Sequence, residues 1–265
     1  MGYAIACGIA RKKVYSKNDI IFIEKKINRI RFLKKSKYRV FQEPQHVINQ
    51  FDKNIKAVII AVKPNDVRKT LITLKKYISK NVLVLSIAAG TKINKISSLL
   101  HKHQPIARVM PNTPCQIGEG MSILTYNKYA TKDQKKEANK IFQSIGKTIE
   151  LNENKFDIVT AISGSGPGYF CYFVESLIES AKNIGLEEKK CVDLVLQTGL
   201  GTMLLLTKTN LTPKALREAV TSKKGTTEAA LKVFQRCNLK KIIYNALSAA
   251  KKRSIILGES WNIFI

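Results

Sequence analysis

The chain has 265 residues, 45% of them hydrophobic, which is long for one domain and comfortable for two with a sizeable core. It contains no continuous apolar run of about 18 residues, so no transmembrane helix is expected. Its first residues lack the basic and apolar regions of a secretory signal. We therefore expect a cytoplasmic protein.

The 46 Lys and Arg residues outnumber the 19 Asp and Glu residues, which gives a formal charge of +27. Such a charge is compatible with nucleic-acid binding. The lysines are spread over nearly every predicted element and are not gathered in one tail or on one face. We therefore favour an enzyme with a lysine-rich surface and no nucleic-acid or membrane partner. The excess charge would still attract anionic ligands at long range.

The five cysteines lie far apart and form no CxxC pair, and the three histidines are scattered. Most of the cysteines fall in apolar helical patterns, so they are interpreted as small core residues. His101 and His103 flank Lys102, but partner ligands are missing, and no metal site is expected there.

The first half of the chain alternates between predicted helices and predicted strands. Its clearest strand signal is a continuous apolar run that is stopped by Pro64. In chain order we expect a helix over 1–12, a buried strand over 19–24, a basic helix from Lys25, a strand over 57–63, a helix over 66–78, and buried strands over 82–89 and 105–110. This alternation predicts an α/β fold with a parallel sheet.

Three of these strands end at segments marked by Gly or Pro. The segments are Lys63–Pro64, Ala88–Gly90 and Pro111–Pro114. In open parallel sheets, ligands bind beyond the carboxyl ends of the strands. The three ends together indicate a nucleotide-binding crevice.

The strand signals stop at about Lys155. Before that point we expect a short strand over 121–126, a helix with Ala138 and Phe142 on one face, and a last strand over 148–152. After it only helices are predicted: up to Ile184, then over 187–207, 213–221 and 226–237, and from Leu239 onward. The helix over 187–207 is apolar on more than one side, so association of subunits is expected.

The stretch Ala161–Tyr169 joins the two halves. Ser163 and Ser165 are typical N-caps, and Pro167 suits a first helical turn. The residues that follow keep helical spacing, so we expect a helix that begins here with its positive end at a hydroxyl-rich loop. Such an end can hold a carboxylate or a phosphate. The alternative is an ordinary tight junction between helices.

Five short motifs occur in order along nearly the whole chain. They are Ala61–Pro64 (AVKP), Ser86–Gly90 (SIAAG), Arg108–Pro114 (RVMPNTP, followed by Gly118 and Gly120), Thr160–Pro167 (TAISGSGP) and Ser222–Thr227 (SKKGTT). In this order and spacing they resemble the motifs of pyrroline-5-carboxylate reductase, the NADPH-linked enzyme of the last step of proline synthesis. Each motif alone is modest, but the five together are highly specific.

The resemblance implies a Rossmann-type domain over 1–153, followed by an all-α dimerisation and substrate domain over 154–265. It implies a homodimer in which the helices of two subunits interlock, with further assembly of dimers open. The implied reaction is hydride transfer from NADPH, with NADH as an alternative donor, to the ring C=N carbon of L-1-pyrroline-5-carboxylate. The product is L-proline, and no metal is implied.

The resemblance also implies a set of site residues. The residues expected to line the cofactor are Ala61, Val62, Lys63, Pro64, Ile87, Ala88, Ala89 and Asn112. The residues expected to face the substrate are Ser163, Gly225, Thr226 and Thr227. The backbone N–H groups of Gly225–Thr227, at a helix start, suit a carboxylate. The Thr227 hydroxyl is the candidate for hydrogen bonding at the ring nitrogen.

Two departures from the family matter. The family opens with a strand and a glycine-rich loop for the pyrophosphate, whereas Met1–Ala4 resembles only the end of that loop. A gap is therefore expected between the strands over 20–24 and 57–63. We expect a native start upstream by ~10 residues. A native mass of 29.8 kDa would refute this. The alternative is an inactive or weakly active remnant that serves only as a dimeric scaffold.

The second departure is Lys223-Lys224, which stands where the family has Pro-Gly. It makes the loop looser and more cationic, and it is interpreted as drift rather than as help for the substrate carboxylate. Cofactor choice is also open, because Glu24 suits a ribose diol and Lys25 and Lys26 suit a 2′-phosphate. NADPH is favoured from the family.

Another two-domain enzyme, a hydroxyacid dehydrogenase, would need a catalytic lysine on the long helix after Pro167. Lys182 is the nearest candidate, but it lies well past the Ser163–Pro167 loop.

Overall fold

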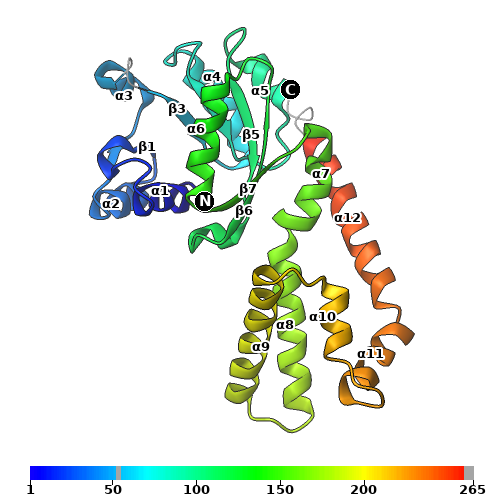
Figure 1. Cartoon of the computed structure of the whole chain (residues 1–265). Coiled ribbons are helices and arrows are strands. Elements are labelled where there is room, and N and C mark those ends of the chain that lie inside the picture. Colours follow the sequence, from blue (N-terminus) through cyan, green and yellow to red (C-terminus); the bar gives the residue numbers. More distant parts are fainter. Residues whose placement is uncertain (52–54, 260–265) are drawn as a thin grey trace. The chain divides into compact units, whose positions relative to one another are not determined.

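The computed structural model describes residues 1–51 and 55–259 (Figure 1). The chain forms two compact units. The first contains residues 1–165 together with α12 from Ala250, and the second contains Gly166–Ala249. The first unit therefore runs past the expected boundary at 153/154, and it also takes in the end of the last helix.

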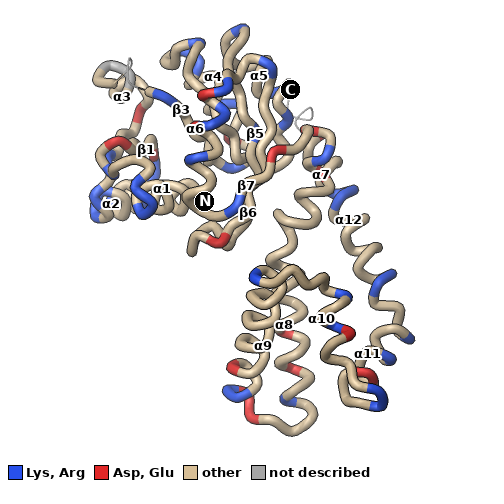
Figure 2. Tube along the Cα trace, in the orientation of Figure 1, with Lys and Arg blue, Asp and Glu red and all other residues tan. Residues whose placement is uncertain are grey.

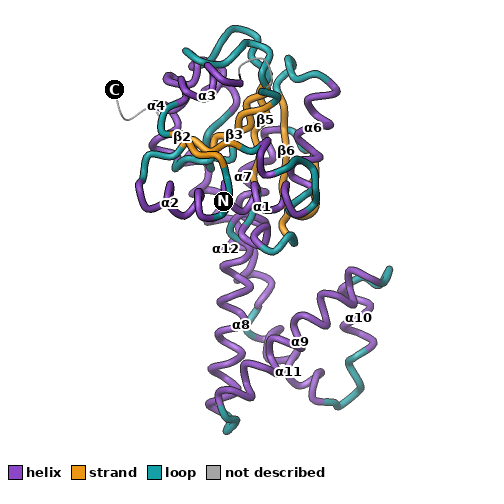
Figure 3. Tube along the Cα trace, turned by 90° about the vertical axis from the view of Figure 1, so that its left-hand side faces the viewer, coloured by secondary structure: helices purple, strands orange, loops and turns teal. Residues whose placement is uncertain are grey.

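The first unit holds all the strands of the described chain, and the second consists of helices and loops (Figure 3). The elements of the first unit are α1 (Gly2–Arg11), β1 (Ile21–Ile23), α2 (Ile27–Lys35), β2 (Arg39–Phe41), α3 (Pro44–Phe51), β3 (Ala57–Ile60), α4 (Pro64–Lys75), β4 (Leu83–Ser86), α5 (Ile93–Leu99), β5 (Ile106–Met110), β6 (Gly120–Tyr126), α6 (Lys132–Gln143), β7 (Gly146–Glu150) and α7 (Phe156–Val159). The sequence predicted neither β2 nor α3.

The main sheet has five strands in the order β3-β4-β5-β6-β7. Strands β3, β4 and β5 are parallel, with Ile60 opposite Ser86 and Ser86 opposite Arg108. β6 runs antiparallel to β5, and β7 runs parallel to β6. The sheet is thus mixed at one side, whereas the sequence predicted parallel strands throughout.

Both faces of the central strands are buried, because successive side chains point to opposite faces. Leu83 and Leu85 of β4 pack against α1 and α6, in a cluster that includes Ile5 and Phe142. Val84 of the same strand packs on the other face, in a cluster with residues of α4 and α5. This two-sided burial explains why β4 and β5 appear in the sequence as nearly continuous apolar runs.

The prediction of a buried strand over 19–24 is wrong in its burial and its length. β1 has only three residues, which are half-buried or exposed, and it pairs with β2 alone. Aromatic contacts hold this small sheet to the helices: the Phe22 and Tyr38 rings lie 5.2 Å apart, and Tyr3 of α1 contacts both Phe32 and Tyr38.

A gap was predicted between the strands over 20–24 and 57–63. In the described part of the chain, β1-β2 and β3–β7 are separate sheets with no strand pairing between them. β3 is therefore an edge strand of the main sheet, which accounts for its half-buried residues; it ends at Ile60 instead of residue 63. The expectation of an upstream start stays a prediction.

One ion pair, buried at its arginine and half-buried at its glutamate, joins three elements of the first unit. Arg108 of β5 is 4% exposed, and its Nη1 lies 3.0 Å from Glu153 Oε1. The guanidinium also lies over the Phe156 ring at the start of α7, 4.6 Å from its centre. The same carboxylate oxygen accepts the Ile93 N–H at the start of α5. The Arg of the third motif therefore has a packing role.

The second unit contains five helices or parts of helices, close to the predicted ranges. They are α8 (Gly166–Asn183), α9 (Glu188–Lys208), α10 (Pro213–Ala219), α11 (Thr226–Arg236) and the first part of α12 (Leu239–Glu259). Many large apolar side chains are exposed here, such as Phe173, Leu196 and Leu200. By length and composition alone, α9 would also pass as a membrane span, although no continuous apolar run marked it in the sequence.

The helix expected at Ser163–Pro167 begins at Gly166 with Pro167 in its first turn, but its start does not follow an open loop. Residues Thr160–Gly164 form a π-helical turn between α7 and α8, and the Ser165 N–H donates to the Thr160 carbonyl at 2.9 Å. The backbone of Ser165 is itself helical, with φ −89° and ψ −20°. The cap-forming residues thus lie inside a nearly continuous helical segment. Pro167 has no N–H for the Ser163 carbonyl, which favours a local irregularity over a regular α-turn.

We predict that Glu153→Gln lowers the free energy of unfolding by about 3 kcal/mol, because it leaves the buried Arg108 charge uncompensated. Glu150→Gln is the matched control, since the Lys135–Glu150 pair is about half exposed and exposed pairs contribute less than about 1 kcal/mol. Urea unfolding of both variants tests this. If both variants lose the same free energy of unfolding, the Arg108–Glu153 pair stabilises the protein no more than the Lys135–Glu150 pair does.

Candidate active site

The three parallel strands bring their carboxyl ends to one edge of the main sheet. Ala61–Pro64 follow β3 and are exposed, and Lys63 caps α4 with Pro64 in the first turn. After β4, Ile87 is half-buried, Ala88 is buried and Ala89 is exposed. The structure thus brings the residues expected to line the cofactor after β3 and β4 to the same edge of the sheet, as the strand ends predicted.

The start of α1 lies at the same edge. A Cβ added to Gly2 would be 3.0 Å from the Ala61 Cβ, and the Cys115 thiol contacts the Met1 sulfur at 3.1 Å. Cys115 belongs to the short 3-10 turn Thr113–Gln116 after β5. Burial raises the pKa of its thiol, so it stays neutral. The positive end of a ten-residue helix therefore faces the segments after β3 and β5.

Asn112 links the segment after β5 to two other elements. Its Oδ1 accepts the Met121 N–H of β6 at 2.9 Å, and its Nδ2 donates to the Ser163 hydroxyl at 3.4 Å. A predicted cofactor residue and a predicted substrate residue are therefore neighbours, although 51 positions separate them in sequence. The π-helical turn carries the Ser163 side chain, and such turns are frequent at functional sites.

The other predicted substrate residues lie in the second unit, at the start of α11. Gly225 is its N-cap, and the Gly225 N–H donates to the Ser222 carbonyl at 3.0 Å. A Cβ at Gly225 would lie 2.3 Å from the Ser222 hydroxyl oxygen, so a larger residue here would have to displace that hydroxyl. Thr226 and Thr227 are the first helical residues, whose N–H groups have no partner within a helix. Thr226 is exposed and Thr227 is half-buried.

Lys223 and Lys224 are both exposed, and Lys224 adopts a left-handed φ of +59°. This strained conformation is the one that glycine adopts freely, which gives the family's glycine at this position a physical reason. The Lys224 N–H donates to the Glu228 carboxylate. That hydrogen bond and the one from Lys232 hold the pKa of Glu228 below its usual value, so the carboxylate stays charged beside the loop.

Glu24 directs its carboxylate to the backbone. Its Oε1 accepts the N–H groups of Lys25 and Lys26, at 2.9 and 3.1 Å. Lys25 pairs with Glu43 at 3.3 Å on the surface. Lys26 is the N-cap of α2 and makes no ion pair within the described chain. The sequence did not predict these hydrogen bonds, because no residue pattern marks a carboxylate that accepts N–H groups of its own loop.

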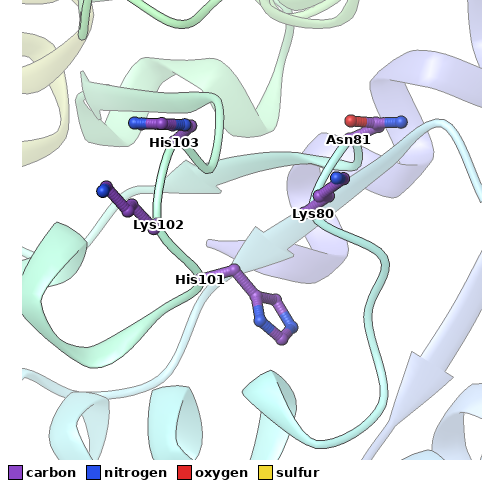
Figure 4. A pocket seen from close by; sticks show the side chains of 5 residues that line it. All are labelled: Lys80, Asn81, His101, Lys102 and His103. Atoms are coloured by element: carbon purple, nitrogen blue, oxygen red, sulfur yellow. The ribbon is translucent and has the colours of Figure 1, made fainter.

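A cavity of about 560 Å³ lies away from this edge and is lined by Lys80, Asn81, His101, Lys102 and His103 (Figure 4). Its residues precede β4 and β5, so they lie at the amino ends of these strands. The His101 ring forms a hydrogen bond with the Ile78 carbonyl. In the close-up, the side chains of Lys102 and His103 point away from the His101 ring.

Metal-ligating residues do not gather anywhere in the described chain: no group of three His, Cys, Asp or Glu side chains is found there. Basic residues are distributed over elements of both units instead of along one element (Figure 2). Lys182, the candidate for a dehydrogenase lysine, pairs with Glu188 at 2.9 Å.

Comparison with known proteins matches both halves of the chain. A family model described as pyrroline-5-carboxylate reductase dimerisation matches residues 153–257, and one described as NADP oxidoreductase, coenzyme F420-dependent, matches residues 1–90. The pyrroline-5-carboxylate reductase of Arabidopsis thaliana is 33% identical over 98% of this chain and 93% of its own length. The chain belongs to the pyrroline-5-carboxylate reductase family.

Solved structures of the family agree with this fold. The Plasmodium falciparum enzyme, crystallised with NADP bound, has a TM-score of 0.86 at 32% identity over 98% of this chain and 95% of that chain. The Coxiella burnetii enzyme has a TM-score of 0.89 at 32% identity, over 97% and 94%. A Rossmann-like unit followed by a helical dimerisation unit is therefore the fold of this family member.

We predict that Asn112→Ala lowers the free energy of unfolding by about 1–3 kcal/mol, because the Met121 N–H loses its acceptor. Asn112→Asp is the matched variant: a carboxylate still accepts that N–H, so a smaller loss is expected. Urea unfolding of both proteins measures the difference. If the alanine variant is as stable as the aspartate variant, Asn112 does not hold β6 as described.

Proposed function

We propose that this protein reduces L-1-pyrroline-5-carboxylate to L-proline with a hydride from NADPH, the last step of proline biosynthesis. The observation that carries the proposal is the similarity to a reductase of this name over 98% of the chain. The arrangement of loops at the carboxyl edge of the main sheet supports it. The alternative of an inactive scaffold is not favoured by these relatives.

In this proposal the residues after β3 and β4, with Asn112, line the cofactor: Ala61, Val62, Lys63, Pro64, Ile87, Ala88, Ala89 and Asn112. The exposed residues of this set, Ala61–Pro64 and Ala89, offer the cofactor a surface that is free of contacts with the core. The start of α1 offers free N–H groups and a positive dipole end to phosphate oxygens. When bound, the nicotinamide supplies the hydride, and this chain supplies position and a water-poor surface.

We assign the substrate carboxylate to the first N–H groups of α11, around Gly225–Thr227. The Thr227 hydroxyl donates a hydrogen bond to the ring nitrogen, which gains a proton as the hydride reaches the adjacent carbon. Ser163, held by Asn112, is the further substrate contact. Orientation of the imine carries much of the catalysis. No cysteine or histidine nucleophile is required.

Self-association completes the proposal. The second unit exposes large apolar residues on several helices, and it matches a dimerisation family model. We assign this surface, with the apolar sides of α9, to contact with a second copy of the chain instead of to a membrane. A homodimer is the smallest assembly that covers it.

We predict that the purified protein oxidises NADPH, followed at 340 nm, only when L-1-pyrroline-5-carboxylate is added. Thr227→Val, which keeps the shape but removes the hydroxyl, is expected to lower kcat about 10- to 100-fold, the value of one strong hydrogen bond. Thr227→Ser keeps the hydroxyl and retains most of the activity. A silent wild-type protein that is folded and dimeric would favour the scaffold alternative.

NADPH is the proposed cofactor over NADH, because the Glu24 carboxylate is engaged with its own loop while Lys26 has no ion-pair partner in the described chain. We predict that Lys26→Met lowers the ratio of kcat/KM for NADPH to that for NADH about tenfold, equal to about 1.4 kcal/mol. Lys34→Met, an exposed lysine near the other end of α2, is the control. An unchanged ratio in the Lys26 variant would place the 2′-phosphate elsewhere.

A further inference from the structure

The last turn of α12 packs against the turn that follows β4. This turn runs from Ala88 to Thr91 and is closed by a single long hydrogen bond, 3.4 Å from the Thr91 N–H to the Ala88 carbonyl. Gly90 stands at its third position with φ +74°, where a type II turn needs a positive φ. A turn closed so weakly depends on its surroundings for a fixed shape.

The backbone of the last turn of α12 packs directly against the backbone of the turn after β4. A Cβ at Gly90 would lie 3.3 Å from the Leu257 carbonyl oxygen, and a Cβ at Gly258 would lie 3.3 Å from the Gly90 carbonyl oxygen. Both distances are tighter than ordinary side-chain contacts. The two glycines therefore let the end of α12 approach the turn by a few tenths of an ångström more closely than residues with a Cβ would.

Two polar contacts anchor the end of α12 in the same unit. Lys95 of α5 donates from Nζ to the Gly258 carbonyl at 2.7 Å, as lysines near helix ends often do for the last carbonyls. The buried Ser254 hydroxyl donates to Asp157 of α7 at 2.7 Å. Partial burial and the nearby Lys92 lower the pKa of Lys95 from its usual value. These contacts fix the helix end against α5 and α7.

We propose that the last turn of α12 positions the Ala88–Gly90 turn for cofactor binding, with Gly258 and Lys95 as positioning residues. The proposal rests on the proposed function, in which Ala88 and Ala89 line the cofactor. Neither Gly258 nor Lys95 touches the cofactor in this account. Both act through the backbone of the turn, whose exposed residue Ala89 faces outward for the ligand.

The Gly258→Ala variant distinguishes an effect on the position of the Ala88–Gly90 turn from an effect on the stability of α12. The residue lies in a helix, where alanine is the better helix former, so the helix itself should not be weakened. The new methyl group must displace the Gly90 carbonyl by a few tenths of an ångström. We expect the Kd for NADPH, measured by fluorescence titration of the full chain, to rise about three- to tenfold, since small misplacements near a site are costly.

Lys95→Met removes the cap on the Gly258 carbonyl and should also raise the Kd and the KM for NADPH at least threefold, with kcat changed less. Lys95→Arg keeps a donor and should restore the affinity. Lys75→Met is the matched control: this exposed lysine lies in the last turn of α4, which leads to the amino end of β4, and its Kd should equal that of the wild type.

Melting temperatures complete the test. If Gly258→Ala and Lys95→Met change only the melting temperature, while the Kd stays within twofold of the wild type, α12 is merely structural and the inference is wrong. If the wild-type protein itself fails to bind NADPH, the proposed function fails instead. If the wild-type protein binds and oxidises NADPH and the variants bind NADPH with the same Kd, the inference is wrong while the proposed function stands.

Discussion

The parallel pairing of β3, β4 and β5 is the constraint on which the rest of the first unit depends. Because their hydrogen bonds fix one direction for all three strands, three loops that are distant in sequence emerge at one edge. Burial of both faces holds this pairing, with α1 and α6 on one side and α4 and α5 on the other. The candidate cofactor residues owe their common location to this sheet.

Polar contacts at the margin of this sheet have a different role from the apolar core. Arg108 and Glu153 join a strand to the starts of two helices, and Asn112 ties β6 and the π-helical turn to the same edge. Each contact satisfies groups that would otherwise be costly to bury. The motif residues of this chain are therefore of two kinds: those that present backbone to a ligand, and those that hold the presenting segments in place.

Much of this could be predicted from sequence. Period and composition predicted the helices of the second half and the strands β4, β5 and β6, because their signals are local. The failures came from long-range effects. The strand over 19–24 was expected to be buried, but it lies in a separate two-stranded sheet, and the antiparallel direction of β6 has no local signal. Ser163 and Ser165 have the chemistry of helix N-caps, yet Ser163 lies inside a π-helical turn that directly precedes α8. The Arg108–Glu153 pair joins residues 45 positions apart, which no spacing rule detects.

The course of α12 also bears on how this protein can be divided or recombined. The helix starts within the second compact unit, but its residues from Ala250 pack with the first. A fragment that stops at the end of the strands would thus lack a stretch of its own unit, with Ser254 and Gly258 missing from their contacts with Asp157 and Lys95. An exchange of helical portions between homologous genes would likewise carry over the end of α12, and the incoming helix end would have to match the recipient's α5 and α7.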